Sequence, residues 1–70
     1  MKAADLRRRL ARLATQRGWD ISEREGRGSH LVLRLNGRTT VIARHPGDMP
    51  AGTFRKILKD LGLTEADLEA

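Results

Sequence analysis

The first third of the chain has apolar residues three or four positions apart, which is the spacing of one helix face. This stripe predicts an amphipathic helix over residues 3–17. Asp5 falls in its first turn, where a carboxylate suits the helix dipole, and Gly18 is placed to end it as a C-terminal cap. The stripe consists of Ala3, Leu6, Leu10, Leu13 and Ala14.

In the middle of the chain the apolar residues recur at every second position instead. Leu31, Leu33 and Leu35 alternate with Val32 and Arg34, the period of a strand with one buried face. Asn36-Gly37 then gives the strongest short hairpin signal, because both residue types tolerate the positive φ angles of a type I′ turn. We therefore expect strands over residues 19–24, 31–35 and 39–44. The phase of the second strand places His30 on the face opposite the leucines, beside Val32 and Arg34.

Helical spacing returns in the last third. A helix is predicted to begin near Pro50, whose fixed φ suits a first turn, and to end at Gly62. Thr64 with Asp67 three residues later resembles a capping box and predicts a short C-terminal helical turn. The apolar face of the main helix is formed by Phe54, Ile57, Leu58 and Leu61.

The predicted order is α-β-β-β-α, which gives an α+β fold. Its three-stranded antiparallel sheet has both main helices on one face and leaves the other face to water. Residues 1–70 are expected to form one domain, because a chain of 70 residues can build only one small core. On this geometry His30 and Arg34 lie on the open face, with Arg44 close by.

Charge is distributed unevenly along the chain. The net charge is +5 and the sequence pI is near 11.1. Residues 1–17 hold six Lys and Arg against one Asp, and residues 24–59 hold eight against two acids, whereas the last ten residues are acidic. A positive field over the body of a domain favours a polyanion such as nucleic acid, although basic surfaces also serve solubility alone.

Composition excludes several classes of function. The chain has no cysteine and two histidines, so neither a disulfide framework, a thiol nucleophile nor a zinc site is expected. No apolar run is long enough for a signal peptide or a membrane span. We therefore expect a cytoplasmic protein that needs neither a metal nor another cofactor.

His30 is the residue with the clearest chemical capacity. Imidazole is the side chain that ordinarily changes charge between pH 5 and 8, which suits general acid/base chemistry on RNA. A surface histidine of no catalytic importance would look the same in the sequence. The preceding Gly26-Arg27-Gly28 is open to two interpretations as well: a flexible turn, or a cradle whose N–H groups approach a phosphate.

Two motifs resemble the HicA family of bacterial toxins. The first is Gly28-Ser29-His30 at the start of a strand. The second is the run from Gly52-Thr53-Phe54-Arg55 to Gly62-Leu63 on the last main helix. Nearly the whole chain is similar to that family, including Gly18-Trp19 after the first helix.

The resemblance implies a domain similar to double-stranded RNA-binding folds, a ribonuclease activity that cuts mRNA, and a HicB-like antitoxin that shields the active site. By position it implies that His30 is the catalytic histidine. His45 corresponds to a second histidine of many relatives, and it is either a turn residue or a partner of His30. The candidate RNA contacts are Gly28, Ser29, Arg34, Arg44, His45 and Lys56.

The chain also departs from the family pattern. Leu31, Val32 and Leu33 stand where many relatives carry a second histidine or an aromatic side chain, and residues 48–51 lack the lysines found before the Gly-Thr pair. The arginines of the first helix, Arg8 and Arg12, are a hypothetical replacement for those contacts. Two other functions stay open at this point: a noncatalytic RNA-binding module, and an interaction protein for an acidic partner.

Overall fold

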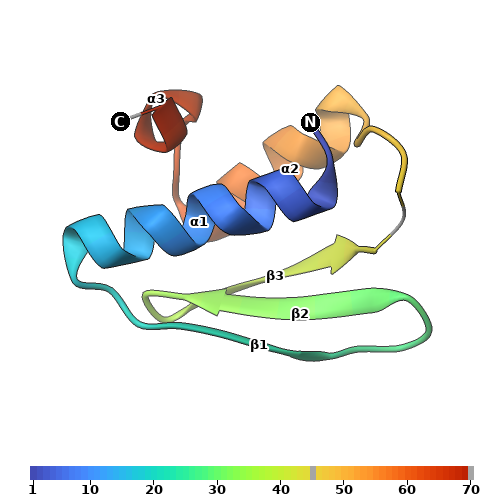
Figure 1. The fold of residues 1–70 in the computed structure, drawn as a ribbon, viewed down its shortest axis with the longest axis horizontal. Coiled ribbons are helices and arrows are strands. Elements are labelled where there is room, and N and C mark those ends of the chain that lie inside the picture. The colour runs from blue at the N-terminus through green and yellow to red at the C-terminus, as the bar shows by residue number, and fades with distance from the viewer. Residues whose placement is uncertain (45, 70) are drawn as a thin grey trace.

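A computed structural model describes residues 1–44 and 46–69. The order of elements is α1 (Ala3–Arg17), β1 (Ile21–Glu25), β2 (His30–Leu35), β3 (Arg38–Ala43), α2 (Ala51–Leu61) and α3 (Glu65–Glu69). The strands form one antiparallel sheet in the order β1-β2-β3, with β2 in the centre. Both long helices lie on one side of this sheet, as Figure 1 shows, and α3 lies beside α1. The predicted α+β architecture is confirmed.

The helices end where the sequence predicts. Gly18 and Gly62 both adopt the left-handed conformation, with φ of 67° and 69°, and their N–H groups bond to the last turn of α1 and α2. A residue with a Cβ is strained in that conformation, which is why glycine is favoured at both positions. Pro50 precedes the first helical residue of α2, so it stands at the N-cap rather than within the first turn.

The hairpin from β2 to β3 follows the Asn36-Gly37 prediction. Both residues have positive φ, 50° and 82°, and Leu35 pairs with Arg38 across the two-residue loop. This register starts β3 at Arg38, one residue before the predicted start, and ends it at Ala43. The prediction that β3 includes Arg44 is therefore wrong by one residue, although the Arg44 N–H still donates to the Ser29 carbonyl at 2.7 Å.

One hydrophobic core joins all the elements. Leucines from α1 and β2 meet Ile42 of β3 and the apolar face of α2, while Trp19 and Phe54 pack at its margin. Thr40 is the buried polar residue of the sheet, and its hydroxyl donates to the Asp60 carboxylate at 2.9 Å. The largest fully buried side chains are those of Leu6, Leu10, Leu13, Leu31, Leu33, Leu35, Ile42 and Ile57.

The short helix α3 is fixed to α1. Leu68 is buried, and Arg17 pairs with Asp67 at 2.6 Å. Asp67 also accepts from the Thr64 N–H at 2.8 Å, which is one half of the predicted capping box. These contacts hold the acidic C-terminal turn on the helix side of the molecule.

Candidate active site

His30 is the first residue of β2 and is exposed on the open face of the sheet. A turn over residues 27–30 delivers it there: the His30 N–H donates to the Arg27 carbonyl at 3.0 Å, and Gly28 takes a positive φ of 56°. The Gly26 N–H then donates to the His30 carbonyl at 2.9 Å and starts the ladder between β1 and β2. The Gly26-Arg27-Gly28 segment therefore forms a tight turn that fixes the backbone of the histidine.

The same carbonyl also orients the imidazole ring. Nδ1 of His30 lies 3.0 Å from the Arg27 carbonyl oxygen. Because a carbonyl oxygen can only accept, this contact requires that Nδ1 carry its hydrogen. In the neutral ring the lone pair is then on Nε2, which is the arrangement a general base needs.

Small residues flank His30 on both sides. Ala43 is its partner on β3, and Gly26 is bonded to it on the β1 side. Neither neighbour carries a side chain beyond Cβ. The imidazole is therefore approachable across the sheet as well as from above.

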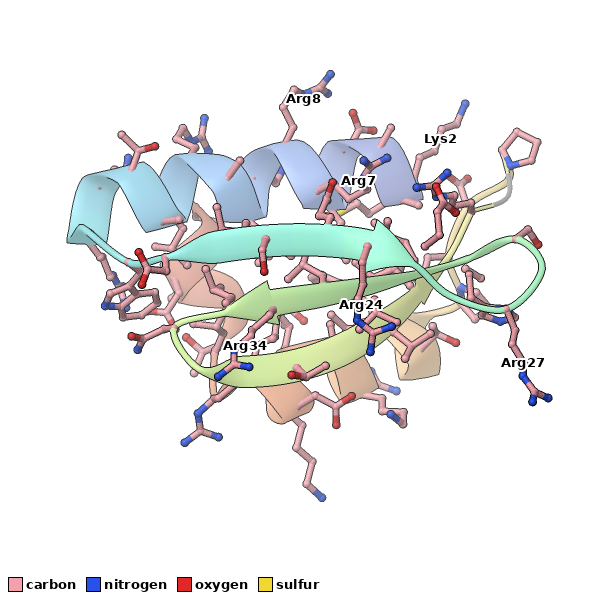
Figure 2. The ribbon with its side chains drawn as sticks, turned by 90° about the horizontal axis from the view of Figure 1, so that it is seen from below. Lys2, Arg7, Arg8, Arg24, Arg27 and Arg34 are labelled. Carbon is pink, nitrogen blue, oxygen red and sulfur yellow. The ribbon has the colours of Figure 1, made fainter. Side chains whose placement is uncertain are left out.

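The rest of the open face is arranged in rows across the three strands. One row contains Arg24, Val32 and Val41, and the next contains Ser22, Arg34 and Thr39. Figure 2 shows Arg24 and Arg34 on this face and Arg27 extending from the turn. Among the residues that the structure describes, the strand positions on this face include no carboxylate and these three arginines form no ion pair.

The acidic residues of β1 have the opposite phase. Glu23 lies opposite Leu33 and Glu25 lies opposite Leu31, both of which face the helices. Arg7 of α1 donates to both oxygens of Glu23, at 2.9 and 2.8 Å. This bond is the main cause that lowers the pKa of the Glu23 carboxyl, and it also raises the pKa of Arg7. The Glu23 carboxylate is therefore neutralised by the Arg7 guanidinium and adds no net negative charge beside the open face.

The predicted contact residues that the structure describes fall into two groups: those beside His30 and those whose charge is already paired. Arg34 shares the open face with His30, and Gly28 and Ser29 form the turn that precedes it. The Arg44 guanidinium is bound by Glu25 at 2.9 Å, so its charge is already offset. Lys56 lies on α2, behind the sheet, and pairs with Asp60 at 2.9 Å. His45 lies outside the described residues.

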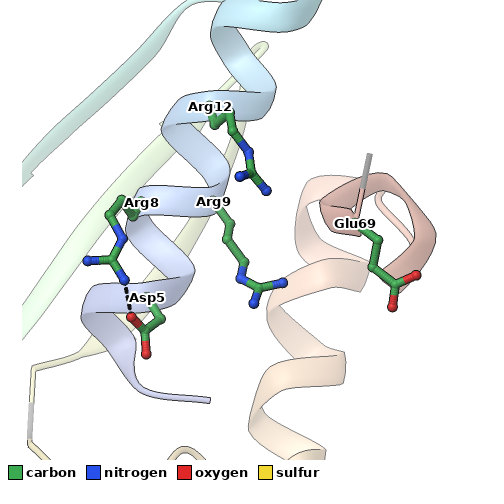
Figure 3. A pocket seen from close by; sticks show the side chains of 5 residues that line it. All are labelled: Asp5, Arg8, Arg9, Arg12 and Glu69. Carbon is green, nitrogen blue, oxygen red and sulfur yellow. Dashed lines mark hydrogen bonds and ion pairs between the residues drawn. The ribbon is translucent and has the colours of Figure 1, made fainter.

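The arginines of α1 form a separate basic surface. Arg8 pairs with Asp5, and Arg12 donates to the Leu68 carbonyl of α3 at 3.4 Å. In Figure 3 these side chains line a hollow between α1 and α3, together with Arg9 and Glu69. This hollow is on the helix side, so the structure does not bring Arg8 or Arg12 to the face that carries His30. Figure 2 shows Arg8 on α1, away from that face.

Arg24 is the open-face cation that sequence reasoning missed. Its signal was present in the sequence. Trp19, Ile21 and Glu23 alternate on one face of the strand, so Ser22 and Arg24 must lie on the other.

In the described part of the chain no group of three His, Asp or Glu side chains is placed to hold a metal ion. No helix in that part is long and apolar enough to cross a membrane.

The fold and the site define a small basic α+β domain with an accessible histidine at the start of its central strand. Comparison with known proteins identifies the family. The family model described as the HicA toxin of bacterial toxin–antitoxin systems matches residues 7–63, so this chain belongs to the HicA toxin family. The predicted resemblance is confirmed.

Two curated relatives are similar over almost the whole chain. They are a probable mRNA interferase HicA of Escherichia coli O157:H7 and a probable mRNA interferase toxin HicA of Escherichia coli strain K12. Each is 40% identical over 65 residues, which covers 91% of this chain and 100% of the relative. The family match ends before α3 begins.

Proposed function

We propose that this chain is an endoribonuclease that cleaves mRNA with His30 as general acid/base, and that it is the toxin of a toxin–antitoxin pair. Membership of the HicA family and the names of the two relatives, both probable mRNA interferases, support the activity. The observation that carries the role of His30 is its geometry: an exposed imidazole whose Nδ1 is held by a backbone carbonyl, on a face with unpaired arginines.

The reaction that suits this geometry is transesterification within the RNA. Nε2 of His30 takes the proton of a ribose 2′-hydroxyl, and the oxygen attacks the adjacent phosphorus. The P–O5′ bond breaks, the leaving 5′-oxygen takes a proton from solvent water, and the protonated His30 returns its proton to solvent. The products are a 2′,3′-cyclic phosphate and a free 5′-hydroxyl. Nearby guanidinium groups stabilise the charge that develops on the phosphate oxygens.

The contacts with RNA are proposed with the roles that the structure allows. Gly28 and Ser29 give a narrow turn beside the reacting phosphate, and Arg34 supplies a cation on the same face. Arg44 acts there when Glu25 releases it. His45 and Lys56 remain proposed contacts, and Lys56 lies on the helix side of the sheet. An mRNA substrate places the activity in the cytoplasm.

We propose a HicB-like protein as the antitoxin. It would neutralise the toxin most directly by covering the open face around His30. That face exposes arginines and valines but no strand carboxylate among the described residues, so it fits a partner surface that presents carboxylates.

The test compares the parent with His30→Ala and with Arg55→Ala, which removes an exposed cation from α2 on the far side of the sheet. Purified proteins are incubated with end-labelled RNA in EDTA, and products are examined for 2′,3′-cyclic phosphate. We expect His30→Ala to lose about a hundredfold to ten-thousandfold in cleavage rate with an unchanged melting temperature. Arg55→Ala should cleave as the parent does.

Three results decide the assignment. Cleavage at the parent rate by His30→Ala would remove the catalytic role of the histidine. A parent protein that shifts RNA mobility without shortening it would instead be the noncatalytic RNA-binding module. An absence of RNA affinity even at low salt would indicate the interaction protein for an acidic partner.

A further inference from the structure

The open face extends well beyond His30, and its exposed groups form a line along the central strand. We propose that this face binds a single RNA strand parallel to β2, with Arg24 and Arg34 as successive phosphate contacts beyond the scissile phosphate at His30. This inference rests on the proposed ribonuclease function and adds a substrate path to it. Arg24 and the hydroxyls of Ser22 and Thr39 have no role in cleavage itself.

The spacing of the rows suits an extended nucleotide chain. Residues two apart on a strand are about 6.6 Å apart along it, so the rows of His30, Val32 and Arg34 repeat at that interval. This interval is close to the separation of neighbouring phosphates in an extended single strand. An RNA strand whose scissile phosphate lies at His30 therefore brings its following phosphates past the middle row and then Arg34.

The last row has the groups of a phosphate site. Arg34 lies between Ser22 and Thr39 in the register, and facing residues in a sheet have Cβ atoms about 4.5–5.5 Å apart. A guanidinium between two hydroxyls offers several donors to one phosphate or one ribose hydroxyl. Beyond this row Asp20 lines the adjoining hollow together with Arg34. Its carboxylate repels a further phosphate, so the path ends there.

The middle row suits a base and its phosphate. Val41 is 50% exposed and Val32 is half-buried beside it, so apolar surface is open to solvent at the centre of the sheet. Arg24 lies beside Val32 on β1, where its guanidinium can bind a phosphate or stack on a base. A shallow depression joins this row to the next and is lined by Ser22, Glu23, Arg24, Val32, Arg34 and Thr39.

The carboxylate beside the middle of this path is already paired. Glu23 is the acidic residue that borders the depression, and both of its carboxylate oxygens are bound by Arg7. The sheet has three strands about 4.8 Å apart, so the path is about 10 Å wide. Such a narrow line of side chains matches one strand better than a duplex, whose phosphates curve away on both strands.

The path can be tested apart from catalysis. A fluorescent, fully 2′-O-methylated hexanucleotide lacks the nucleophile and is not cleaved, so its binding is measured by anisotropy over a range of salt. The variants are Arg24→Gln and Arg34→Gln, with Arg55→Gln on α2 as the matched loss of one exposed charge. Cleavage by the same proteins is measured on an unmodified hexanucleotide and on a dinucleotide that has only the scissile phosphate.

We expect each of Arg24→Gln and Arg34→Gln to weaken binding about tenfold, the lower range for a hydrogen bond to a charged group. Each should also reduce the slope of log affinity against log salt by about 0.7, the value for one phosphate of a single strand. Both variants should lose about tenfold in kcat/KM on the hexanucleotide. On the dinucleotide Arg24→Gln should lose nothing, because Arg24 has no proposed role in cleavage itself. Arg55→Gln should leave the slope and the cleavage of both substrates unchanged.

The outcomes separate the two proposals. Parent-like binding and cleavage by both path variants, with an inactive His30→Ala protein, would overturn the path and leave the nuclease intact. Arg34-dependent binding by a protein that never cleaves would overturn the nuclease and support the path. Tighter binding of a matched duplex than of the single strand would overturn the single-strand assignment.

Discussion

The two faces of the sheet carry opposite tasks, although the same central strand supplies both. Leu31, Leu33 and Leu35 of β2 are at most 1% exposed on the side that the helices cover. The residues that alternate with them lie on the face that no helix covers; His30 and Arg34 are exposed there and Val32 is half-buried. Burial of each leucine contributes about 1.5–3 kcal/mol to stability, whereas an exposed polar side chain contributes little. One face therefore holds the fold, and the other is available for chemistry.

The largest difference in stability is expected between two side-chain truncations, one on each face of the sheet. Leu33→Ala removes a fully buried side chain and should destabilise the domain by about 2–5 kcal/mol, because it leaves a cavity as well as losing burial. Val41→Ala on the exposed face should change stability by about 0.5 kcal/mol or less. Urea denaturation followed by circular dichroism measures both. Equal losses in the two variants would contradict the division of tasks.

The next largest difference in stability is expected between alanine substitutions at two glycines, Gly28 and Gly52. Gly28 has a positive φ and open space around it, so Gly28→Ala should cost about 1 kcal/mol through backbone strain alone and lower the melting temperature by about 4–8 °C. Gly52 of α2 also has open space but lacks the positive φ, so Gly52→Ala should stabilise by up to about 1 kcal/mol. Because Gly28 shapes the turn that orients His30, its variant should also cleave RNA more slowly.

Acid should destabilise the helix side of the molecule. The pKa of Glu23 is lowered by Arg7, that of Asp60 by Lys56 and Thr40, and that of Asp67 by the Thr64 N–H and Arg17. Carboxyls with a depressed folded pKa stabilise fully above their unfolded values, near 4, and lose that contribution as the pH falls through the folded values. The melting temperature should be level from pH 7 to about 5 and then fall. Glu23→Gln should lower it at pH 7 and reduce the later fall.

The smallest loss of stability is expected when only the Arg7–Glu23 ion pair is removed. Both side chains are about one-third exposed, so solvent screens the pair and Arg7→Met should cost about 0.2–1 kcal/mol at low salt. The loss should decrease at 1 M NaCl. In the double variant Arg7→Met with Glu23→Gln, the combined loss should be less than the sum of the single losses. Strict additivity of the two losses would show that the pair contributes no coupling.

Patterns of short range predicted most of the fold from the sequence. The α1 stripe, the glycines that end α1 and α2, and the Asn36-Gly37 hairpin each depend on residues within one turn of each other. The outward position of His30 also followed, because alternation along a strand fixes the face of every residue once the leucines are known to be buried. The start of β3 was missed by one residue, since the register depends on which residues close the loop.

Contacts between distant elements could not be predicted in the same way. The pairing of Arg44 with Glu25 and the position of Lys56 behind the sheet depend on packing and side-chain reach, which a count of charges does not contain. The bond from His30 Nδ1 to the Arg27 carbonyl depends on the conformation of a turn. The sequence therefore placed Arg34 on the same face as His30, but it did not show that Arg44 is paired with Glu25 or that Lys56 lies behind the sheet.

The alternation along β2 has a consequence for how such a toxin can be lost. If His30 acts as proposed, a cell under selection to escape poisoning can replace it without touching the leucines of the same strand. The resulting protein would still fold and accumulate, and it could continue to occupy its antitoxin. Escape mutants in this family are therefore expected to be harmless but well expressed, and measurements of protein abundance alone would not detect them.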